Sequence, residues 1–348
     1  MQTSCFEKYK DKGQTGLANI GNTCYVNSLI QCLSHTYELN DFLDSKTYET
    51  RLTKTPDTLL LLEWDKLRKL MWSKNCNIAP HGFIKTIHNV ALQKELSLFT
   101  GYDQNDLQEF LLFVIDCFHN AISREVDMEV CGSVVNNRDV MAKECYNMMC
   151  NMYQNDYSEF VNMFYGIHVS VITELNKDTV LSIKPEPFFV LSLPLPMDIK
   201  QHTDIFSCMD EFCKTDILEG ENEWFNEKTN KKQSVNKGLQ FWSLPNILII
   251  HLKRWNLSQK KDKRLVSVPL EDCDFTKYIK GYNASTYIYE LYGVCNHHGT
   301  GEISGHYTAN VKNANGQWYT FNDMSVTTIL PEHVINVHAY CLFFRKKK

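Results

Sequence analysis

Apolar residues recur with a helical period through the first part of the chain, up to about residue 162. One apolar stripe follows the i, i+3, i+4 and i+7 positions at Val26, Leu29, Ile30 and Leu33, and this spacing predicts a helix buried along one face. The same spacing predicts helices over residues 59–71 and 107–118. Residues 128–163 are rich in Met, Tyr and Asn, and their pattern leaves helix and irregular structure open.

From about Phe164 the pattern changes to short runs of β-branched and aromatic residues bounded by Gly or Pro, which predicts strands. The predicted strands are 167–172, 188–193, 247–252, 287–294, 306–311, 318–321 and 340–344. Asn315-Gly316 is a hairpin signal between two of them, whereas residues 197–240 form a polar stretch. A helical first half followed by a stranded second half predicts an α+β fold, with the functional site where the two halves meet.

Length, charge and hydropathy restrict the function classes. The chain has 348 residues, which fits one large domain or two ordinary ones of about 150 residues each. Its formal net charge of -5 argues against nucleic acid as a partner. No apolar run approaches the roughly 18 residues of a membrane span, so we expect no membrane partner. Residues 1–13 are interpreted as a polar lead-in without a signal peptide, and residues 346–348 as a short, solvated basic tail.

Cysteine usage points to a reducing compartment. The chain has 13 cysteines, an odd number, and the absence of a signal peptide predicts free thiols in an intracellular protein of the cytoplasm or nucleus. The sequence contains no Cys-x-x-Cys pair, and the spacings of Cys145 with Cys150 and of Cys208 with Cys213 fit zinc poorly. We therefore expect no metal and no cofactor.

Cys24 stands at the start of the first predicted helix, after the turn-forming residues Gly21 and Asn22. Unpaired N–H groups and the helix dipole favour an anion there, and the thiolate is the form of cysteine that attacks carbonyl groups. A buried cysteine without a chemical role is the alternative that this position alone leaves open.

A cysteine nucleophile needs a base, usually a histidine that a third group orients. Of the 12 histidines, His306 begins a predicted strand directly after Gly305. Asn322 and Asp323 end the partner strand of the predicted hairpin, whose register can place Asn322 beside His306.

Three separated motifs, GLANIGNTCYVNSLIQCL, LPNILIIHLKRW and GHYTANV with QWYTFNDMSV, occur in this order between about residues 15 and 344. They resemble the Cys box and the His box of the ubiquitin-specific proteases, a family of papain-like cysteine deubiquitinases. The resemblance implies a single catalytic domain over residues 14–345 with an α+β papain-like fold. It implies a thumb at about 14–163, fingers within about 164–240 and a palm at about 241–345.

The resemblance also implies catalytic roles by position. Cys24 is expected to be the nucleophile and His306 the general base and acid. Asn322 takes the family's third-member position and orients the imidazole, while Asp323 is an auxiliary group that adds charge or positions a water. We expect Asn322 and Asp323 to share the third-member role. Asn19 matches the side-chain donor of the oxyanion hole.

Four further residues are expected to contact substrate. Residues 102–110 resemble the family's acidic helix start, where Asp106 and Glu109 would pair with arginines in the C-terminal tail of ubiquitin. Acidic residues that only favour a helix N-terminus are the alternative. Gly305 would line a narrow passage that selects the Gly-Gly tail, and Tyr307 next to it is the fourth expected contact.

The implied function is thiol-dependent hydrolysis of the isopeptide or peptide bond after the C-terminal glycine of ubiquitin, by a monomer. Ubiquitin and ubiquitinated proteins are the implied partners. Many family members hold a zinc in the fingers with two Cys-x-x-Cys pairs, but residues 174–177 and 226–229 contain no cysteine, so we expect that zinc site to be lost. A protease for another ubiquitin-like modifier and a catalytically inactive ubiquitin-binding module are the alternatives.

Overall fold

The computed structural model describes residues 6–177, 179–197, 202–256, 260–301 and 304–347. The α-helices are α1 (Cys24–Ser34), α2 (Tyr37–Asp44), α3 (Pro56–Ser73), α4 (His81–Gln93), α5 (Leu107–Ile122), α6 (Asn137–Tyr153), α7 (Glu159–Phe164) and α8 (Ile205–Phe212). Short 3-10 helices occupy Glu7–Tyr9, Thr47–Arg51, Gly220–Asn222, Thr276–Tyr278, Ala284–Thr286 and Pro331–His333. None of the described helices is both long and apolar enough to cross a membrane.

The strands form a large sheet, a smaller sheet and three two-stranded pairs. The large sheet, which we call the palm sheet, has the order β17-β16-β15-β14-β18-β11-β5, with β13 beside β14. Its strands are β5 (Val190–Pro194), β11 (Ile247–Lys253), β13 (Cys273–Asp274), β14 (Ile288–His298), β15 (His306–Lys312), β16 (Trp318–Asn322), β17 (Ser325–Ile329) and β18 (Ala339–Lys346).

The smaller sheet, which we call the fingers sheet, has the order β4-β3-β10-β7. Its strands are β3 (Gly166–Glu174), β4 (Val180–Phe188), β7 (Asp216–Leu218) and β10 (Val235–Ser243). The two-stranded pairs are β1 (Gly16–Leu17) with β2 (Asn77–Ile78), β6 (Thr203–Asp204) with β12 (Val266–Ser267), and β8 (Trp224–Asn226) with β9 (Lys231–Gln233).

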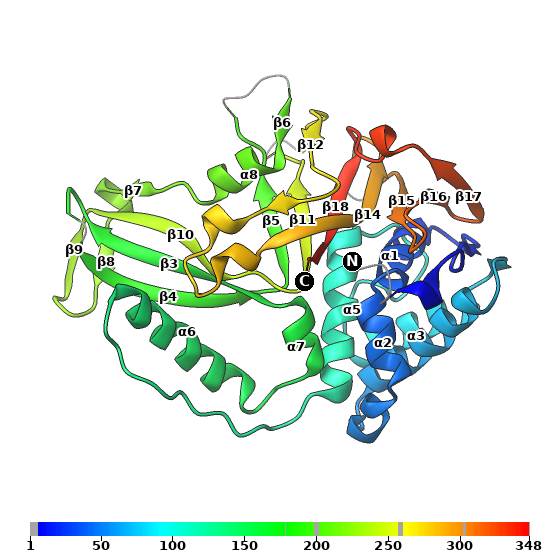
Figure 1. The fold of residues 1–348 in the computed structure, drawn as a ribbon, viewed down its shortest axis with the longest axis horizontal. Coiled ribbons are helices and arrows are strands. Elements are labelled where there is room, and N and C mark those ends of the chain that lie inside the picture. The colour runs from blue at the N-terminus through cyan, green and yellow to red at the C-terminus, as the bar shows by residue number, and fades with distance from the viewer. Residues whose placement is uncertain (1–5, 178, 198–201, 257–259, 302–303, 348) are drawn as a thin grey trace.

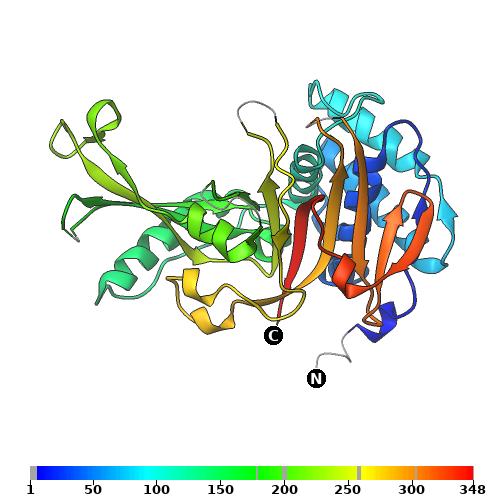
Figure 2. The ribbon, with the colours of Figure 1, turned by 90° about the horizontal axis from the view of Figure 1, so that it is seen from above.

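The palm sheet lies between the helices α1 to α5 and the fingers sheet, which projects from the other end of the molecule (Figures 1 and 2). One hydrophobic core joins α1, α3, α4 and α5 to one face of the palm sheet, and a second core fills the opposite face under α8. Every residue of α1 is buried, so this helix is enclosed on all sides rather than along one stripe. The first residue of α1 is therefore held rigidly against the sheet.

Most of the predicted elements are confirmed. The helices expected over 59–71 and 107–118 are α3 and α5, and the hairpin expected around Asn315-Gly316 is the antiparallel pair β15 and β16. The undecided region 128–163 contains α6 and α7 after an irregular segment. The single strand expected at 188–193 is wrong, because the chain leaves the fingers sheet at the end of β4 and enters the palm sheet with β5.

The described residues at both ends of the chain pack against the domain, although we expected a polar lead-in at one end and a solvated tail at the other. Tyr9 is buried and its ring stacks on Tyr37 at a centroid distance of 4.5 Å. The Phe6 ring covers the guanidinium of Arg345 at 4.8 Å, and β18 extends to Lys346. The described part of the lead-in is thus packed against the last strand, and the tail expected at 346–348 begins inside that strand.

We predict that the purified protein contains no stoichiometric structural zinc. Such a site needs about four deprotonated ligands in tetrahedral reach, and the described residues contain no cluster of His, Cys, Asp or Glu side chains suited to a metal ion. The fingers sheet is instead held by pairing of β10 with β3 and β7, and by packing of α6 against it. Elemental analysis is expected to give far less than one zinc per chain, and EDTA to leave the Tm unchanged. One zinc per chain that is removable only with loss of folding would contradict this prediction.

Candidate active site

The loop before α1 adopts the predicted turn and places Cys24 at the helix start. Gly21 and Asn22 both have positive φ, at 108° and 54°. The backbone N–H of Thr23, the N-cap residue, donates to Oδ1 of Asn19 at 3.0 Å. Cys24 follows as the first residue of α1 and is 4% exposed. A backbone hydrogen bond from Tyr307, the residue after His306, reaches its sulfur. The nucleophile candidate therefore lies against the first residues of strand β15.

His306 and Asn322 meet across the β15–β16 hairpin as the register predicts. Nε2 of His306 lies 2.7 Å from Oδ1 of Asn322. Because a carbonyl oxygen only accepts, this contact puts the proton of the neutral imidazole on Nε2 and leaves a lone pair on Nδ1. The arrangement therefore supplies a base with an oriented ring.

Asp323 turns away from the imidazole and binds two asparagines instead. The residue has a positive φ of 50° in the turn after β16, which ends the strand at Asn322. Oδ2 of Asp323 accepts from Nδ2 of Asn19 at 3.1 Å, and Oδ1 accepts from Nδ2 of Asn27 at 2.8 Å. The structure thus gives Asn322 and Asp323 different partners, whereas the sequence led us to expect that both would act on His306.

Burial raises the pKa of the Cys24 thiol above its usual value. The hydrogen bond from Tyr307 opposes this increase, and the negative charge of Asp323 adds to it. The raised pKa disfavours the thiolate, whereas the position at a helix start led us to expect that an anion is favoured there. Reaction requires that a base remove the proton during attack.

We predict that alkylation of Cys24 by iodoacetamide keeps accelerating as pH rises above about 8.5, the pKa of an ordinary thiol. A raised pKa means a smaller thiolate fraction at any given pH, so the midpoint of the rate profile moves to higher pH. Mass spectrometry of peptides resolves each thiol, and the exposed residues Cys76 and Cys131 serve as internal references. A profile for Cys24 that reaches its plateau below that of the references would instead indicate a thiolate–imidazolium pair in the free protein.

Asp106 and Tyr307, both expected to contact substrate, are buried in a hydrogen-bonded cluster beneath the site. Asp106 is 6% exposed, and its Oδ1 caps α5 by accepting from the backbone N–H groups of Gln108 (2.7 Å) and Glu109 (3.2 Å). Its Oδ2 accepts from the hydroxyls of Tyr307 (3.2 Å) and Tyr340 (2.7 Å). The geometry favours the helix-capping alternative for Asp106. Glu109 is exposed one turn along α5, and its contact with substrate stays a prediction.

Gly305 lies where no side chain fits. A Cβ atom there would stand 2.4 Å from the carbonyl oxygen of His298 and 2.8 Å from Nε2 of His297. Its N–H donates to Oε1 of Gln104 at 3.2 Å, which links the segment before α5 to the strand that carries His306. The contact lies where the sequence predicts a narrow passage, and the passage itself stays a prediction.

Sequence reasoning missed five residues that hold the site together. They are Asn27, Gln104, Lys261, His297 and Tyr340. Each acts on a residue that is far away in sequence, so no local spacing could reveal them. His297 lies opposite the expected contact Tyr307 in the β14–β15 pair, but the strand predicted at 287–294 ends before it.

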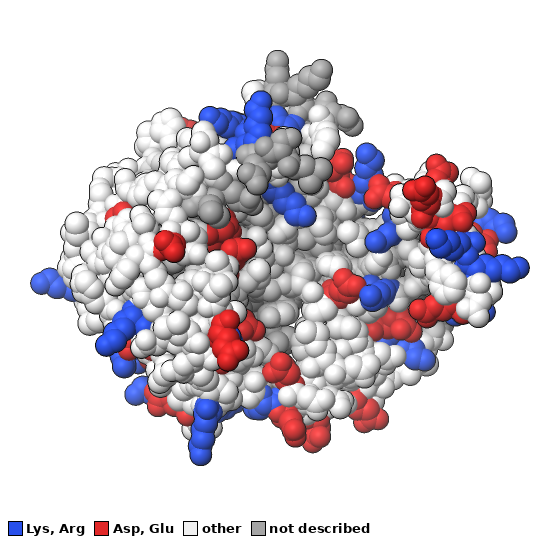
Figure 3. Space-filling view, turned by 180° about the vertical axis from the view of Figure 1, so that it is seen from behind, with Lys and Arg blue, Asp and Glu red and all other residues white. Residues whose placement is uncertain are grey.

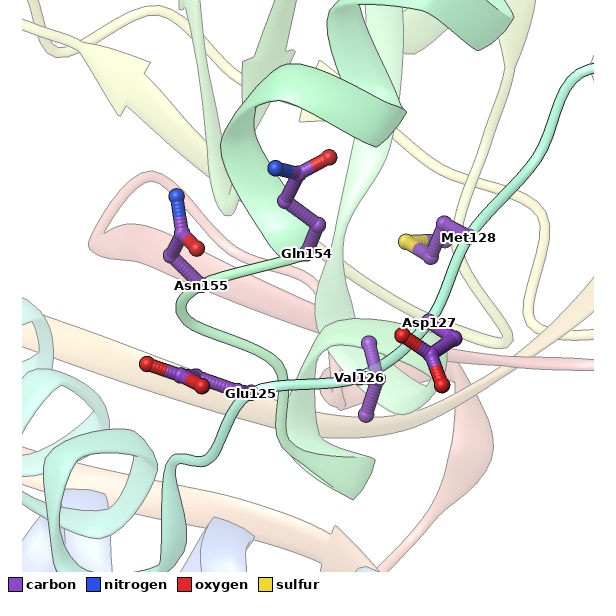
Figure 4. Close-up of a pocket in the computed structure, with 6 residues that line it drawn as sticks. All are labelled: Glu125, Val126, Asp127, Met128, Gln154 and Asn155. Carbon is purple, nitrogen blue, oxygen red and sulfur yellow. The ribbon is translucent and has the colours of Figure 1, made fainter.

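Two hollows of the surface differ in their relation to the site. The face seen in Figure 3 is hollowed between the helices and the fingers, with Asp and Glu side chains as well as Lys and Arg side chains around the depression. A separate pocket of about 420 Å³ lies between the segment after α5 and the end of α6. Its side chains, including Glu125, Asp127 and Gln154, point in different directions rather than to a common centre (Figure 4). It is built from none of the expected site residues.

One protein family matches nearly the whole chain. The family model described as ubiquitin carboxyl-terminal hydrolase matches residues 15–344. The chain is 32% identical to human ubiquitin carboxyl-terminal hydrolase 2 over 342 residues, covering 96% of this chain and 55% of that protein. It is 31% identical to the chicken protein of the same name over 341 residues, covering 96% of this chain and 93% of that one. The chain thus spans about half the length of the human relative.

The solved structures agree with the family match. One similar structure is the SAGA DUB module of Ubp8, Sgf11, Sus1 and Sgf73 bound to monoubiquitin, with a TM-score of 0.74 and 25% identity over 99% of this chain and 71% of that chain. Another is the same module bound to ubiquitin aldehyde, with a TM-score of 0.72 and 25% identity over 98% of this chain and 71% of that one. The predicted α+β papain-like fold is confirmed.

Proposed function

The chain belongs to the ubiquitin carboxyl-terminal hydrolase family, and from this premise we propose that it is a thiol-dependent deubiquitinase. It hydrolyses the isopeptide or peptide bond after the C-terminal glycine of ubiquitin. The observation that carries the proposal is the contact of 2.7 Å between His306 and Asn322, because it leaves Nδ1 of the imidazole able to take a proton from Cys24. All these groups come from one chain, which supports a monomeric enzyme.

The proposed reaction proceeds through a thioester. His306 accepts the thiol proton as the Cys24 sulfur attacks the glycine carbonyl carbon, and the carbonyl oxygen becomes an oxyanion. The backbone N–H of Cys24 and one N–H of the Asn19 amide stabilise that oxyanion, while the other N–H of the amide binds Asp323. The amine leaves with the proton from His306. A water that His306 deprotonates then attacks the thioester, releases the ubiquitin carboxylate and returns the proton to the thiol.

The passage beside Gly305 supports a substrate that ends in two glycines. Gly305 itself has no room for a side chain, and Gln104 lies across from it at 3.2 Å. A substrate backbone can displace the Gln104 side chain and take over the Gly305 N–H, and a tail of two glycines brings no side chain of its own into this approach. Glu109 at the start of α5 would pair with an arginine of the tail.

We propose that ubiquitin occupies the hollow between the helices and the fingers. Ubiquitin in two similar structures and the hollow itself, which Asp and Glu side chains line together with Lys and Arg (Figure 3), support this assignment. The 12 described cysteines are all free, which supports a location in the cytoplasm or nucleus.

A panel of modifiers that carry a fluorogenic group on the C-terminal glycine tests this function. The expected result is that kcat/KM is highest for ubiquitin. A higher value for another ubiquitin-like modifier would replace ubiquitin as the substrate. Failure of the protein to hydrolyse any modifier, together with tight binding of ubiquitin, would make it a binding module.

A further inference from the structure

Lys261 is a buried ammonium group for which the described residues offer no ion pair. The residue is 7% exposed and pairs with Trp255 through an isolated β-bridge. Its Nζ lies 2.8 Å from Nδ1 of His297, 2.6 Å from the His297 carbonyl oxygen and 3.2 Å from the Gly299 carbonyl oxygen. Burial, followed by the charges of Arg254 and Lys263, lowers its pKa to about 8. The Trp255 ring lies 5.1 Å from the ammonium, but no carboxylate of the described residues pairs with it. A buried charge without a counter-ion costs free energy, so a residue of this kind is expected to serve the site.

The ammonium fixes the state of His297. Because Lys261 donates to Nδ1, the proton of the neutral imidazole must lie on Nε2. His297 is fully buried, and burial and the charge of Lys261 lower its pKa to about 3, so the ring stays neutral. Its Nε2 has no hydrogen-bond partner among the described residues. This atom instead lies beneath Gly305, 2.8 Å from the position that a Cβ would take.

The position of the His297 imidazole restrains Gly305 and, through it, the start of β15 at His306. The His297 ring packs on Tyr307 at a centroid distance of 4.6 Å, and the β14–β15 register sets His297 opposite Tyr307. His306 lies between Gly305 and Tyr307, both of which rest on the same imidazole. A change in the position of His297 would therefore move the backbone of His306 on both sides.

We propose that Lys261 is a positioning residue for the reaction: it holds His297 as a floor beneath Gly305 and so keeps His306 aligned with Cys24. The inference rests on the proposed function, because it assigns Lys261 to the same reaction. Lys261 touches neither substrate nor nucleophile in this role. It acts through three hydrogen bonds that only a group with three N–H donors can make.

The variant Lys261→Met tests the proposal, since methionine keeps the length of the side chain but has no donor. With the fluorogenic ubiquitin substrate, kcat is expected to fall about 10- to 100-fold, because a misplacement of about 1 Å costs up to about 10²-fold. KM should change little. The Tm should fall only modestly, because the variant removes a buried charge but leaves Nδ1 of His297 and two carbonyl oxygens without their donor. Lys263→Met is the matched control, an exposed lysine of the same segment, and should change neither quantity.

A double variant with His297→Ala adds a second readout. If Lys261 acts through His297, the double variant should have the same kcat as the less active of the two single variants. Independent roles would instead multiply the two losses. An unchanged kcat in Lys261→Met would overturn the proposal. A loss of kcat that disappears when the assay is run far below the Tm of the variant, or failure of both Lys261→Met and Lys261→Gln to fold, would also overturn it and give Lys261 a structural role. If the wild-type protein is inactive on ubiquitin but active on another modifier, the proposed substrate is wrong. The ratio of the kcat of Lys261→Met to that of the wild type on this other modifier then still tests the role of Lys261.

Discussion

Replacement of Cys24 with alanine is expected to abolish hydrolysis of ubiquitin conjugates and to leave ubiquitin binding intact. The sulfur is the atom that would form the thioester, so its removal eliminates the covalent route and should lower kcat by about 10⁴-fold or more. Cys24 is 4% exposed, so the change hardly alters the surface that ubiquitin would cover. A fluorogenic ubiquitin substrate measures kcat, and titration with labelled ubiquitin measures Kd.

Cys32→Ala provides the matched control on the same helix. Cys32 lies in the core, where its sulfur is 3.5 Å from that of Cys295, and a buried cysteine of this kind acts as a small apolar residue. The control should keep nearly all activity at a small cost in stability. Residual turnover of more than a few per cent in Cys24→Ala would mean that another residue is the nucleophile. An inactive but folded Cys32→Ala would mean that the loss does not report the thiol chemistry of Cys24.

The sequence predicts the parts of the fold whose side chains repeat with a clear period. Residues 107–118 bury one face against a large core, and the Asn315-Gly316 turn sets the register that brings His306 to Asn322. β10 was missed because most of its residues are only partly buried. Such a strand carries no continuous apolar run that would mark it in the sequence. The break between β4 and β5 was missed because residues on both sides of Phe189 are apolar, although they belong to different sheets.

The sequence predicted the contacts of the site that form within one hairpin. It did not predict those between segments that are far apart in the chain. Asn322 could be placed beside His306 from strand register alone. The partners of Asp323 could not be found in this way, since Asn19 and Asn27 belong to the opposite end of the chain and approach only when α1 docks on the palm sheet. Asp106 shows the same limit: its position predicts a helix cap, but the two tyrosine hydroxyls that bury its second oxygen come from β15 and β18.

Because Asn322 and Asp323 have different partners, their substitutions are expected to act independently of each other. Asn19→Ala removes the side-chain donor of the oxyanion hole and should lower kcat by about 10²- to 10³-fold. Asp323→Ala leaves that amide without the carboxylate that orients it and should cause a smaller loss of the same kind. The double variant of Asn19 and Asp323 should lose less kcat than the product of the two single losses, although Asp323 also holds Asn27. In contrast, the losses from Asn322→Ala and Asp323→Ala should multiply, since one acts on the imidazole and the other on the oxyanion donor.

The reactivity of Cys24 provides a readout that separates these roles from general damage to the site. Asp323 contributes to the raised pKa of the Cys24 thiol, so removal of its negative charge lowers that pKa and increases the thiolate fraction at neutral pH. Asp323→Ala should therefore alkylate faster with iodoacetamide at pH 7 while it turns over substrate more slowly. Asp323→Asn, which keeps an oxygen acceptor without the charge, should show the same faster alkylation with a smaller loss of kcat. Losses from Asn322→Ala and Asp323→Ala that do not multiply, with slower alkylation in Asp323→Ala, would instead place both residues on His306.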